Sequence, residues 1–146
     1  MRTVRYRMLA TPLFVHCCHC TWCQRETGSA FVVNALVEAD RFELVQGEIE
    51  RIDTPSSSGQ GQEIVRCPVC KVALWSTTAR RGGRFISCAS ERSRIRAPAR
   101  RTYIYISTRQ PWVVPPADVP AVPEYYRRSD YWPAESIARY RKAVGK

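Results

Sequence analysis

Cysteine and histidine side chains crowd one short stretch of the sequence. Residues 16–23 read HCCHCTWC, which places six cysteine or histidine residues in eight positions. A second pair, Cys67 and Cys70, forms a C-P-V-C motif. Thiols at such spacing act as disulfide partners, as nucleophiles, or as ligands of a metal ion such as Zn²⁺.

The cysteine count and the first residues argue against a disulfide framework. The sequence has seven cysteines, an odd number, and its start, MRTVRYRMLATPLFV, lacks the sustained apolar core and cleavage site of a secretory signal. No apolar run approaches the ~20 residues needed to cross a membrane. We therefore expect a cytoplasmic protein without a membrane segment, whose reduced thiols serve metal binding or thiol chemistry.

The spacing of the first cluster brings particular thiols together. A C-x-x-C turn places both sulfurs on one side, within reach of one tetrahedral ion at about 2.3 Å each. Upstream, an extended backbone alternates faces, so Cys18 and Cys20 point one way while Cys17 and His19 point the other. Cys18, Cys20 and Cys23 can therefore converge on one ion.

Three interpretations are open from the residues alone. Cys20 and Cys23 could join Cys67 and Cys70 in a closed, structural four-thiolate site. A thioredoxin-like redox pair would need a C-x-x-C motif inside a βαβ unit, which this β-rich chain lacks. In the third interpretation, Cys18, Cys20 and Cys23 hold the ion and leave its fourth position open, as catalytic zinc sites do.

The elements that must position these cysteines are short and rich in β-branched and aromatic residues, as strands are. With 146 residues, 45% hydrophobic and 25% charged, the chain resembles an ordinary soluble domain in length and composition. We predict a mainly β protein with a single domain spanning residues 1–146. The predicted strands are 3–8, 13–16, 29–38, 42–47, 48–53, 63–67, 73–77, 84–87 and 102–107.

Two loops and a helix complete the predicted architecture. Residues 54–62 are expected to form an exposed hairpin-type loop, and the proline-rich residues 110–126 to lie extended over the surface. A helical tail is predicted at residues 128–146, with Ser129 or Asp130 as its N-cap. Three tryptophans are expected to be packing anchors: Trp75, Trp112 and Trp132.

The net charge of +10 raises the question of nucleic acid as a partner. Residues 80–101 contain eight arginines and one glutamate, a net +7, so the rest of the chain is nearly balanced. These arginines are not interleaved with aromatic residues as they are in single-strand binders. We therefore favour a solvated loop here and treat nucleic acid as the less favoured partner.

Four segments together resemble one known family. VHCCHCTWCQRETGSAF, RCPVCKVALW, RQPWV and YWPAESIAR closely resemble the glutathione-dependent formaldehyde-activating enzyme family, which includes centromere protein V. The resemblance extends from Val4 to Arg139. It implies an Mss4-like fold of coiled β-sheets with zinc knuckles, and an activity that condenses glutathione with formaldehyde.

The resemblance also implies a role for each cysteine motif. Cys18, Cys20 and Cys23 would hold a zinc ion with an open position, the catalytic site. Cys67 and Cys70, with an early C-x-C pair, would hold a second zinc ion. The implied function is zinc-dependent carbon–sulfur lyase chemistry on a glutathione-type thiol and an aldehyde. The alternative is an inactive zinc-binding module that contacts nucleic acid through its arginine-rich loop.

The chain departs from the family pattern near the second knuckle. It begins MRTVRY and lacks the early C-x-C pair, so we expect a degraded second site that Cys17, Cys88, a histidine or water completes, or that holds no ion. Lys71 stands where the family prefers glycine, at a position that tends to need a positive φ. Two thiolates alone do not close a tetrahedral site.

A third departure covers residues 88–102, CASERSRIRAPARRT. One set of codons for the first part of this segment, read in another frame, encodes V-R-V-G-T-L, which is the family motif at this place. We hypothesise a local frameshift, in which case the arginine cluster says nothing about nucleic acid. Resequencing the locus tests this hypothesis.

Residues around the first cluster have weaker assignments. His19 is interpreted as structural, and His16 is a candidate supplementary ligand because an extended strand points it to the same side as Cys18. Cys17 and Cys88 are expected to be buried or free thiols. Arg25 is a candidate for orienting a carboxylate, such as those of glutathione.

Overall fold

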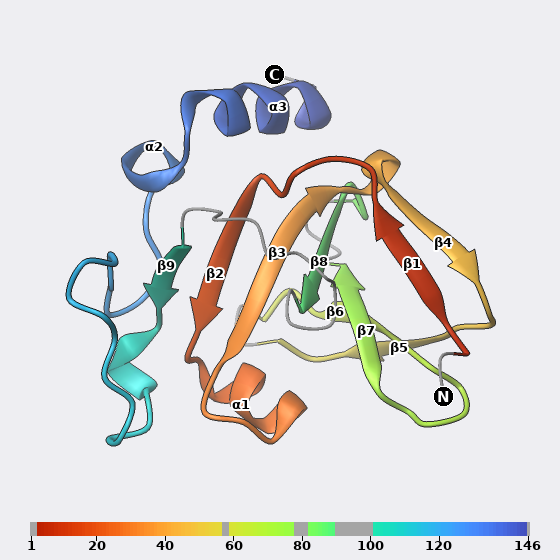
Figure 1. The fold of residues 1–146 in the computed structure, drawn as a ribbon, viewed down its shortest axis with the longest axis horizontal. Helices are drawn as coiled ribbons and strands as arrows, with labels where there is room; N and C mark the ends of the chain where they lie inside the picture. The colour runs from red at the N-terminus through yellow and green to blue at the C-terminus, as the bar shows by residue number, and fades with distance from the viewer. Residues whose placement is uncertain (1–2, 57–58, 78–81, 90–100, 146) are drawn as a thin grey trace.

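A computed structural model describes residues 3–56, 59–77, 82–89 and 101–145, and strands dominate it, which confirms the mainly β prediction (Figure 1). The strands are β1 (Arg5–Met8), β2 (Phe14–Cys18), β3 (Val32–Glu38), β4 (Phe42–Gln46), β5 (Glu50–Thr54), β6 (Gln62–Arg66), β7 (Ala73–Thr77), β8 (Phe85–Ala89) and β9 (Arg101–Ile104). The helices are α1 (Thr21–Thr27), α2 (Arg128–Tyr131) and α3 (Ala134–Val144), with 3₁₀ turns η1 (Ala39–Arg41) and η3 (Ile106–Thr108).

Seven strands form one sheet in the order β5-β6-β7-β8-β3-β2-β9, and β1 pairs with β4 in a separate antiparallel ladder. Neighbours in the large sheet are antiparallel, except that β2 and β9 are parallel. Strand β2 therefore lies between β3 and β9, and it ends directly at α1 (Figure 1).

Side chains of β2 are buried on both faces of the sheet. On one face, Val15 and Cys17 pack in a core with Trp75, and this core lies against β1 and β4. On the opposite face, Phe14 stacks on Trp132 with ring centroids 5.6 Å apart, beneath α2 and α3. The alternation expected of an extended strand thus decides which thiols enter the core and which face the other way.

The predicted helical tail is present but divided into two helices. Pro133 lacks an N–H and disfavours helical geometry in the residue before it. Helix α2 therefore ends before this proline, and α3 begins after it. The predicted N-cap is wrong: Ser129 and Asp130 lie inside α2, whose cap is Arg127. Gly145, with φ of 75°, ends α3.

Two further predictions differ from the structure. Strand β9 ends at Ile104 rather than at residue 107, because Tyr105 has a left-handed backbone with φ of 57°. Trp112 is 72% exposed and is not a packing anchor, whereas Trp75 and Trp132 are buried as expected. The hairpin loop between β5 and β6 is confirmed by their antiparallel pairing.

Some predictions concern residues that the structure does not describe. Most of the arginine-rich window at 80–101, and most of residues 88–102 on which the frameshift hypothesis rests, lies outside the described residues. Both stay predictions, as do the single-domain extent and the cytoplasmic location. Within the described residues, no helix combines the length and apolar character that a membrane crossing requires.

Candidate metal centre

Three thiols meet where β2 ends and α1 begins. Cys18 is the last residue of β2, Cys20 is the N-cap of α1, and Cys23 lies in its first turn. Their Sγ atoms all lie within 4.8 Å of one another. Among the described residues, this is the one group of three or more cysteine, histidine or acidic side chains placed closely enough to hold a metal ion.

The local backbone explains this convergence. Cys20 is extended, with φ of −64° and ψ of 151°, and its Sγ accepts a hydrogen bond from the Cys23 N–H at 3.4 Å. A thiol therefore takes the place that a serine or aspartate side chain usually has at a helix N-terminus. Gly28, with φ of 64°, ends the helix after two turns and returns the chain to β3.

The three thiols suit a thiolate-binding cation such as Zn²⁺. Tetrahedral zinc, with bonds of about 2.3 Å to sulfur, separates its thiolates by about 3.8 Å, which the observed spacing allows. Hydrogen bonds with Cys18 and then Cys23 lower the pKa of Cys20, while those with Cys20 and Cys23, together with burial, raise the pKa of Cys18. Because a metal ligand must be deprotonated, a bound cation would replace the protons of these thiols.

A network of hydrogen bonds fixes the turn between Cys18 and Cys20. The carbonyl of His19 accepts from Gln24 Nε2 at 2.5 Å and from Thr108 Oγ1 at 3.0 Å. Gln24 Nε2 also donates to the Thr108 carbonyl at 2.8 Å, and Gln110 Nε2 donates to Gln24 Oε1 at 2.6 Å. The segment that follows β9 therefore holds the cysteine turn in place.

The histidines of the motif lie outside the thiol group. His19 is fully buried, its ring is stacked on Tyr103, and its Nε2 lies 3.7 Å from Cys17 Sγ on the core side of β2. Burial lowers the pKa of His19, and Arg109 adds to the effect. His16 lies on the other face, where its Nε2 and the Tyr126 hydroxyl are 2.6 Å apart.

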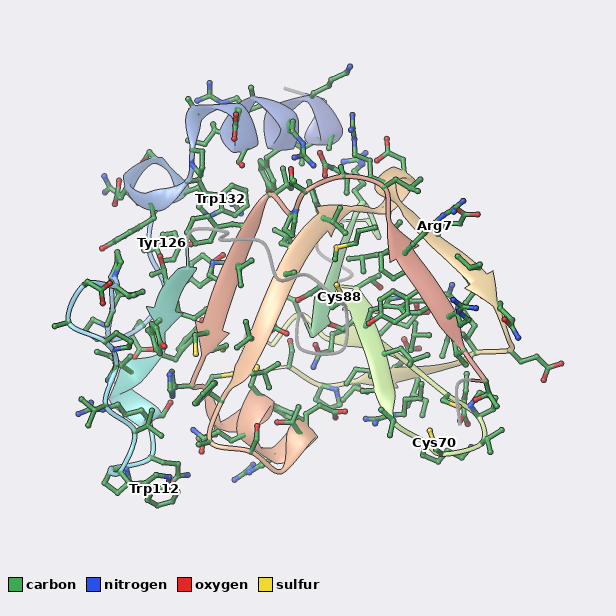
Figure 2. All side chains as sticks on the ribbon, viewed as in Figure 1. Arg7, Cys70, Cys88, Trp112, Tyr126 and Trp132 are labelled. Atoms are coloured by element: carbon green, nitrogen blue, oxygen red, sulfur yellow. The ribbon has the colours of Figure 1, made fainter. Side chains whose placement is uncertain are left out.

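The C-P-V-C knuckle lies elsewhere. Neither Cys67 nor Cys70 belongs to the thiol group, so the structure does not bring the two C-x-x-C pairs together. Cys67 Sγ lies 3.4 Å from Thr3 Oγ1, while Cys70 is exposed in the connection between β6 and β7 (Figure 2). The backbone N–H of Cys70 and the Thr3 hydroxyl lower the pKa of Cys67 to about 7. Thr3 thus occupies the neighbourhood in which the resemblance implies the early cysteine pair.

Lys71 has the positive φ expected from its position after the knuckle, with φ of 59°. Its N–H donates to the Cys67 carbonyl at 2.9 Å, and its Nζ pairs with Glu50 at 2.7 Å in an exposed ion pair. We expect Lys71→Gly to be about 1 kcal/mol more stable than Lys71→Ala, because both lose the ion pair and only glycine relieves the left-handed strain. Urea unfolding of the two variants measures this difference, and equal stabilities would contradict it.

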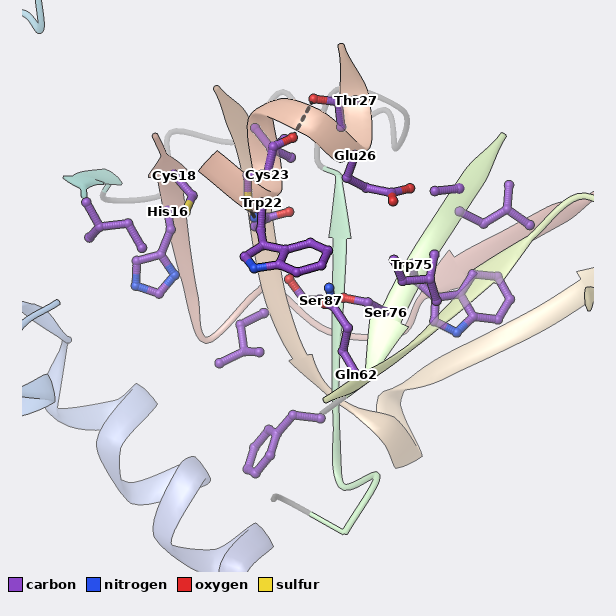
Figure 3. A pocket seen from close by; sticks show the side chains of 18 of the residues that line it. His16, Cys18, Trp22, Cys23, Glu26, Thr27, Gln62, Trp75, Ser76 and Ser87 are labelled. Atoms are coloured by element: carbon purple, nitrogen blue, oxygen red, sulfur yellow. Dashed lines mark hydrogen bonds between the residues drawn. The ribbon is translucent and has the colours of Figure 1, made fainter. Parts of the chain in front are cut away.

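A pocket of about 250 Å³ opens beside the thiol group. Cys18 and Cys23 line it, and Figure 3 shows Trp22 of α1 extending into it toward Ser76 and Ser87 of the sheet. Its floor is the sheet face that carries the even-numbered residues of β2 and β3. The remaining lining residues are His16, Glu26, Thr27, Val32, Asn34, Leu36, Gln62, Ile64, Ala73, Leu74, Trp75, Phe85, Ile104 and Tyr125.

Several residues around the pocket are not among the site residues predicted from the sequence. Asn34 pairs with His16 across β2 and β3, and its Nδ2 lies 4.0 Å from Cys23 Sγ. Trp22, between two of the cysteines, could have been noticed from its position in the motif. Arg25 does not line the pocket; it borders a separate shallow hollow with Trp112.

Comparison with known proteins agrees with the site. A sequence profile of the family described as glutathione-dependent formaldehyde-activating enzyme matches residues 2–105, and the chain therefore belongs to this family. A search of curated proteins found no match. Among solved structures, the chain is similar to a Rhodobacter sphaeroides protein determined for Northeast Structural Genomics, with 14% identity over 82% of this chain and 93% of that chain and a TM-score of 0.44. Family membership suggests glutathione-dependent activation of an aldehyde.

Proposed function

We propose that the protein adds a glutathione-type thiol to an aldehyde at a zinc ion held by Cys18, Cys20 and Cys23, and catalyses the reverse carbon–sulfur cleavage. The observation that carries this proposal is the thiol group itself, three Sγ atoms within 4.8 Å, of which Cys18 and Cys23 border a pocket. A small molecule in the pocket can thus reach the metal site. Family membership supports the same chemistry.

The proposed reaction is an addition that needs no oxidant or reductant. The thiol releases its proton, its sulfur forms a bond to the aldehyde carbon, and the π electrons of the carbonyl move to the oxygen, which takes up a proton. With formaldehyde and glutathione the product is S-hydroxymethylglutathione. Cleavage of the same carbon–sulfur bond, with the proton returned to sulfur, is the lyase direction.

The chain's own residues would prepare this step by holding and enclosing the reactants. When bound, zinc favours the thiolate form of a coordinating thiol at neutral pH. The bonds from Gln24 and Thr108 to the His19 carbonyl hold the ligand turn rigid. Trp22 and the apolar floor would exclude water from the reacting atoms, which strengthens electrostatic interactions there.

The second motif has a separate proposed role. Cys67 and Cys70 would bind a second zinc ion only weakly, because two thiolates leave half of a tetrahedral shell to other donors. The lowered pKa of Cys67 supports this role, since a metal ligand must be deprotonated. We expect a mild chelator to remove this ion before it removes the zinc ion held by Cys18, Cys20 and Cys23.

Zinc content and zinc-edge X-ray absorption of the reduced, full-length protein test the proposal. We expect one tightly bound zinc ion with three protein sulfurs, and a fourth sulfur when glutathione is added. S-methylglutathione, which lacks the thiol, is the matched control and should add none. We also expect faster exchange between glutathione and its formaldehyde adduct in NMR exchange spectra. The absence of zinc, or a coordination shell of four protein donors that glutathione leaves unchanged, would overturn the proposal.

A further inference from the structure

The pocket beside the three cysteines is larger than formaldehyde requires. Formaldehyde has two non-hydrogen atoms, which makes it similar in size to one or two water molecules of about 30 Å³ each. The pocket has about 250 Å³ and runs from the metal site across β3 to β6 and β7. Formaldehyde would therefore leave most of this space to water.

Apolar residues make up much of the pocket floor, beside the polar side chains of Asn34, Ser76 and Ser87. Leu36 of β3, Ile64 of β6 and Phe85 of β8 line it, and all three are buried. The indole of Trp22 also lines the pocket, where the close view shows it extending toward Ser76 and Ser87 (Figure 3). A pocket lined by an indole and by aliphatic and aromatic side chains is suited to a flat or branched apolar group, which gains about 25 cal/mol for each Å² removed from water.

The charges at the pocket favour a neutral occupant. None of the described residues that line it is a lysine or an arginine. Its carboxylate, Glu26, is already paired with Arg66, with Nη2 and Oε1 2.5 Å apart. Among the described lining residues, the two carboxylates of glutathione therefore find no lysine or arginine partner, and we place its charged ends outside the pocket. The pocket is therefore available to the other reactant, the aldehyde.

We infer that this pocket receives an aldehyde that carries a neutral aryl or branched alkyl group of about six to eight non-hydrogen atoms, a size that its volume allows. The inference rests on the proposed function and names its second substrate class. The chemistry is the same addition: the thiol sulfur bonds to the aldehyde carbon, and the carbonyl oxygen takes up a proton. The apolar group lies on the sheet floor while the aldehyde carbon faces Cys18 and Cys23.

The binding test uses benzyl alcohol, an unreactive probe with the ring of an aryl aldehyde, on the full-length protein with and without zinc. We choose Ser76 of β7 for substitution, because it lines the pocket and a larger side chain there would occupy the pocket space. We expect Ser76→Phe to weaken benzyl alcohol binding about tenfold, because the new ring takes the space of the probe, while Ser76→Ala changes it less than about twofold. Ligand-observed NMR titration measures both. We expect 4-(hydroxymethyl)benzoate to bind about tenfold more weakly than benzyl alcohol, because its carboxylate finds no lysine or arginine among the described residues of the lining.

The same variants separate this inference from the proposed function. NMR exchange rates with glutathione should favour benzaldehyde over formaldehyde in the unaltered protein, and Ser76→Phe should reverse the preference. If glutathione and formaldehyde exchange at the zinc site but benzyl alcohol does not bind, or if both Ser76 variants bind it equally, the inference is wrong and the proposed function stands. If benzyl alcohol binds as expected but no zinc is held, the proposed function fails while the assigned pocket remains.

Discussion

Cys20→Ser is expected to abolish tight zinc binding and, with it, the binding of glutathione at the metal. Structural zinc sites contribute about 10–16 kcal/mol in total, so losing one thiolate costs about 3 kcal/mol, or a hundredfold or more in affinity. The fold should persist, because serine is also a good N-cap and its hydroxyl can accept from the Cys23 N–H as the thiol does. Competition with a chromophoric chelator measures the zinc affinity.

The matched control is Cys17→Ser, the same change one residue before Cys18. Cys17 is buried on the opposite face of β2, in the core, so its replacement should lower stability slightly and leave zinc affinity intact. Cobalt substitution gives a second measurement, since thiolate-to-cobalt charge-transfer absorption should fall in Cys20→Ser and persist in Cys17→Ser. Equal zinc affinities in the two variants would mean that the three-thiol group is not the metal site.

The thiol group could be predicted because its geometry is local. Strand alternation separates Cys18 from Cys17, and a tight turn joins Cys20 to Cys23, all within seven residues. The positive φ of Lys71 is local in the same way. These features follow from backbone geometry that does not depend on distant parts of the chain.

The pocket could not be predicted because it is built from strands that are far apart in the sequence. Leu36, Ile64 and Phe85 each look like an ordinary core residue, and only the sheet order places them on one floor. The prediction that Trp112 is a packing anchor was wrong for a related reason, because an aromatic residue packs only where a partner surface exists. Strand register and packing, rather than residue type, decide which residues line the pocket and which aromatic residues are buried.

Arg139→Ala is expected to lower the free energy of unfolding by about 3 kcal/mol, because it leaves a buried carboxylate without its main partner. Glu38, at the end of β3, is 4% exposed. Arg139 of α3 contacts both of its oxygens, Nε at 2.9 Å and Nη2 at 2.7 Å, and also donates to the Thr11 carbonyl. Arg41, 3.9 Å from Glu38, offers only partial compensation from its exposed position. Urea and thermal unfolding measure the loss.

Arg141→Ala is the matched control, since Arg141 is exposed on the same helix and its loss should change stability by less than about 0.5 kcal/mol. Adding Glu38→Gln to Arg139→Ala should recover part of the loss, because an amide costs less to bury unpaired than a carboxylate. Glu38 lies at the opposite end of β3 from α1, so folded Arg139→Ala protein should have the same zinc affinity as the unaltered protein. If Arg139→Ala were as stable as Arg141→Ala, the ion pair would not anchor α3 to the sheet.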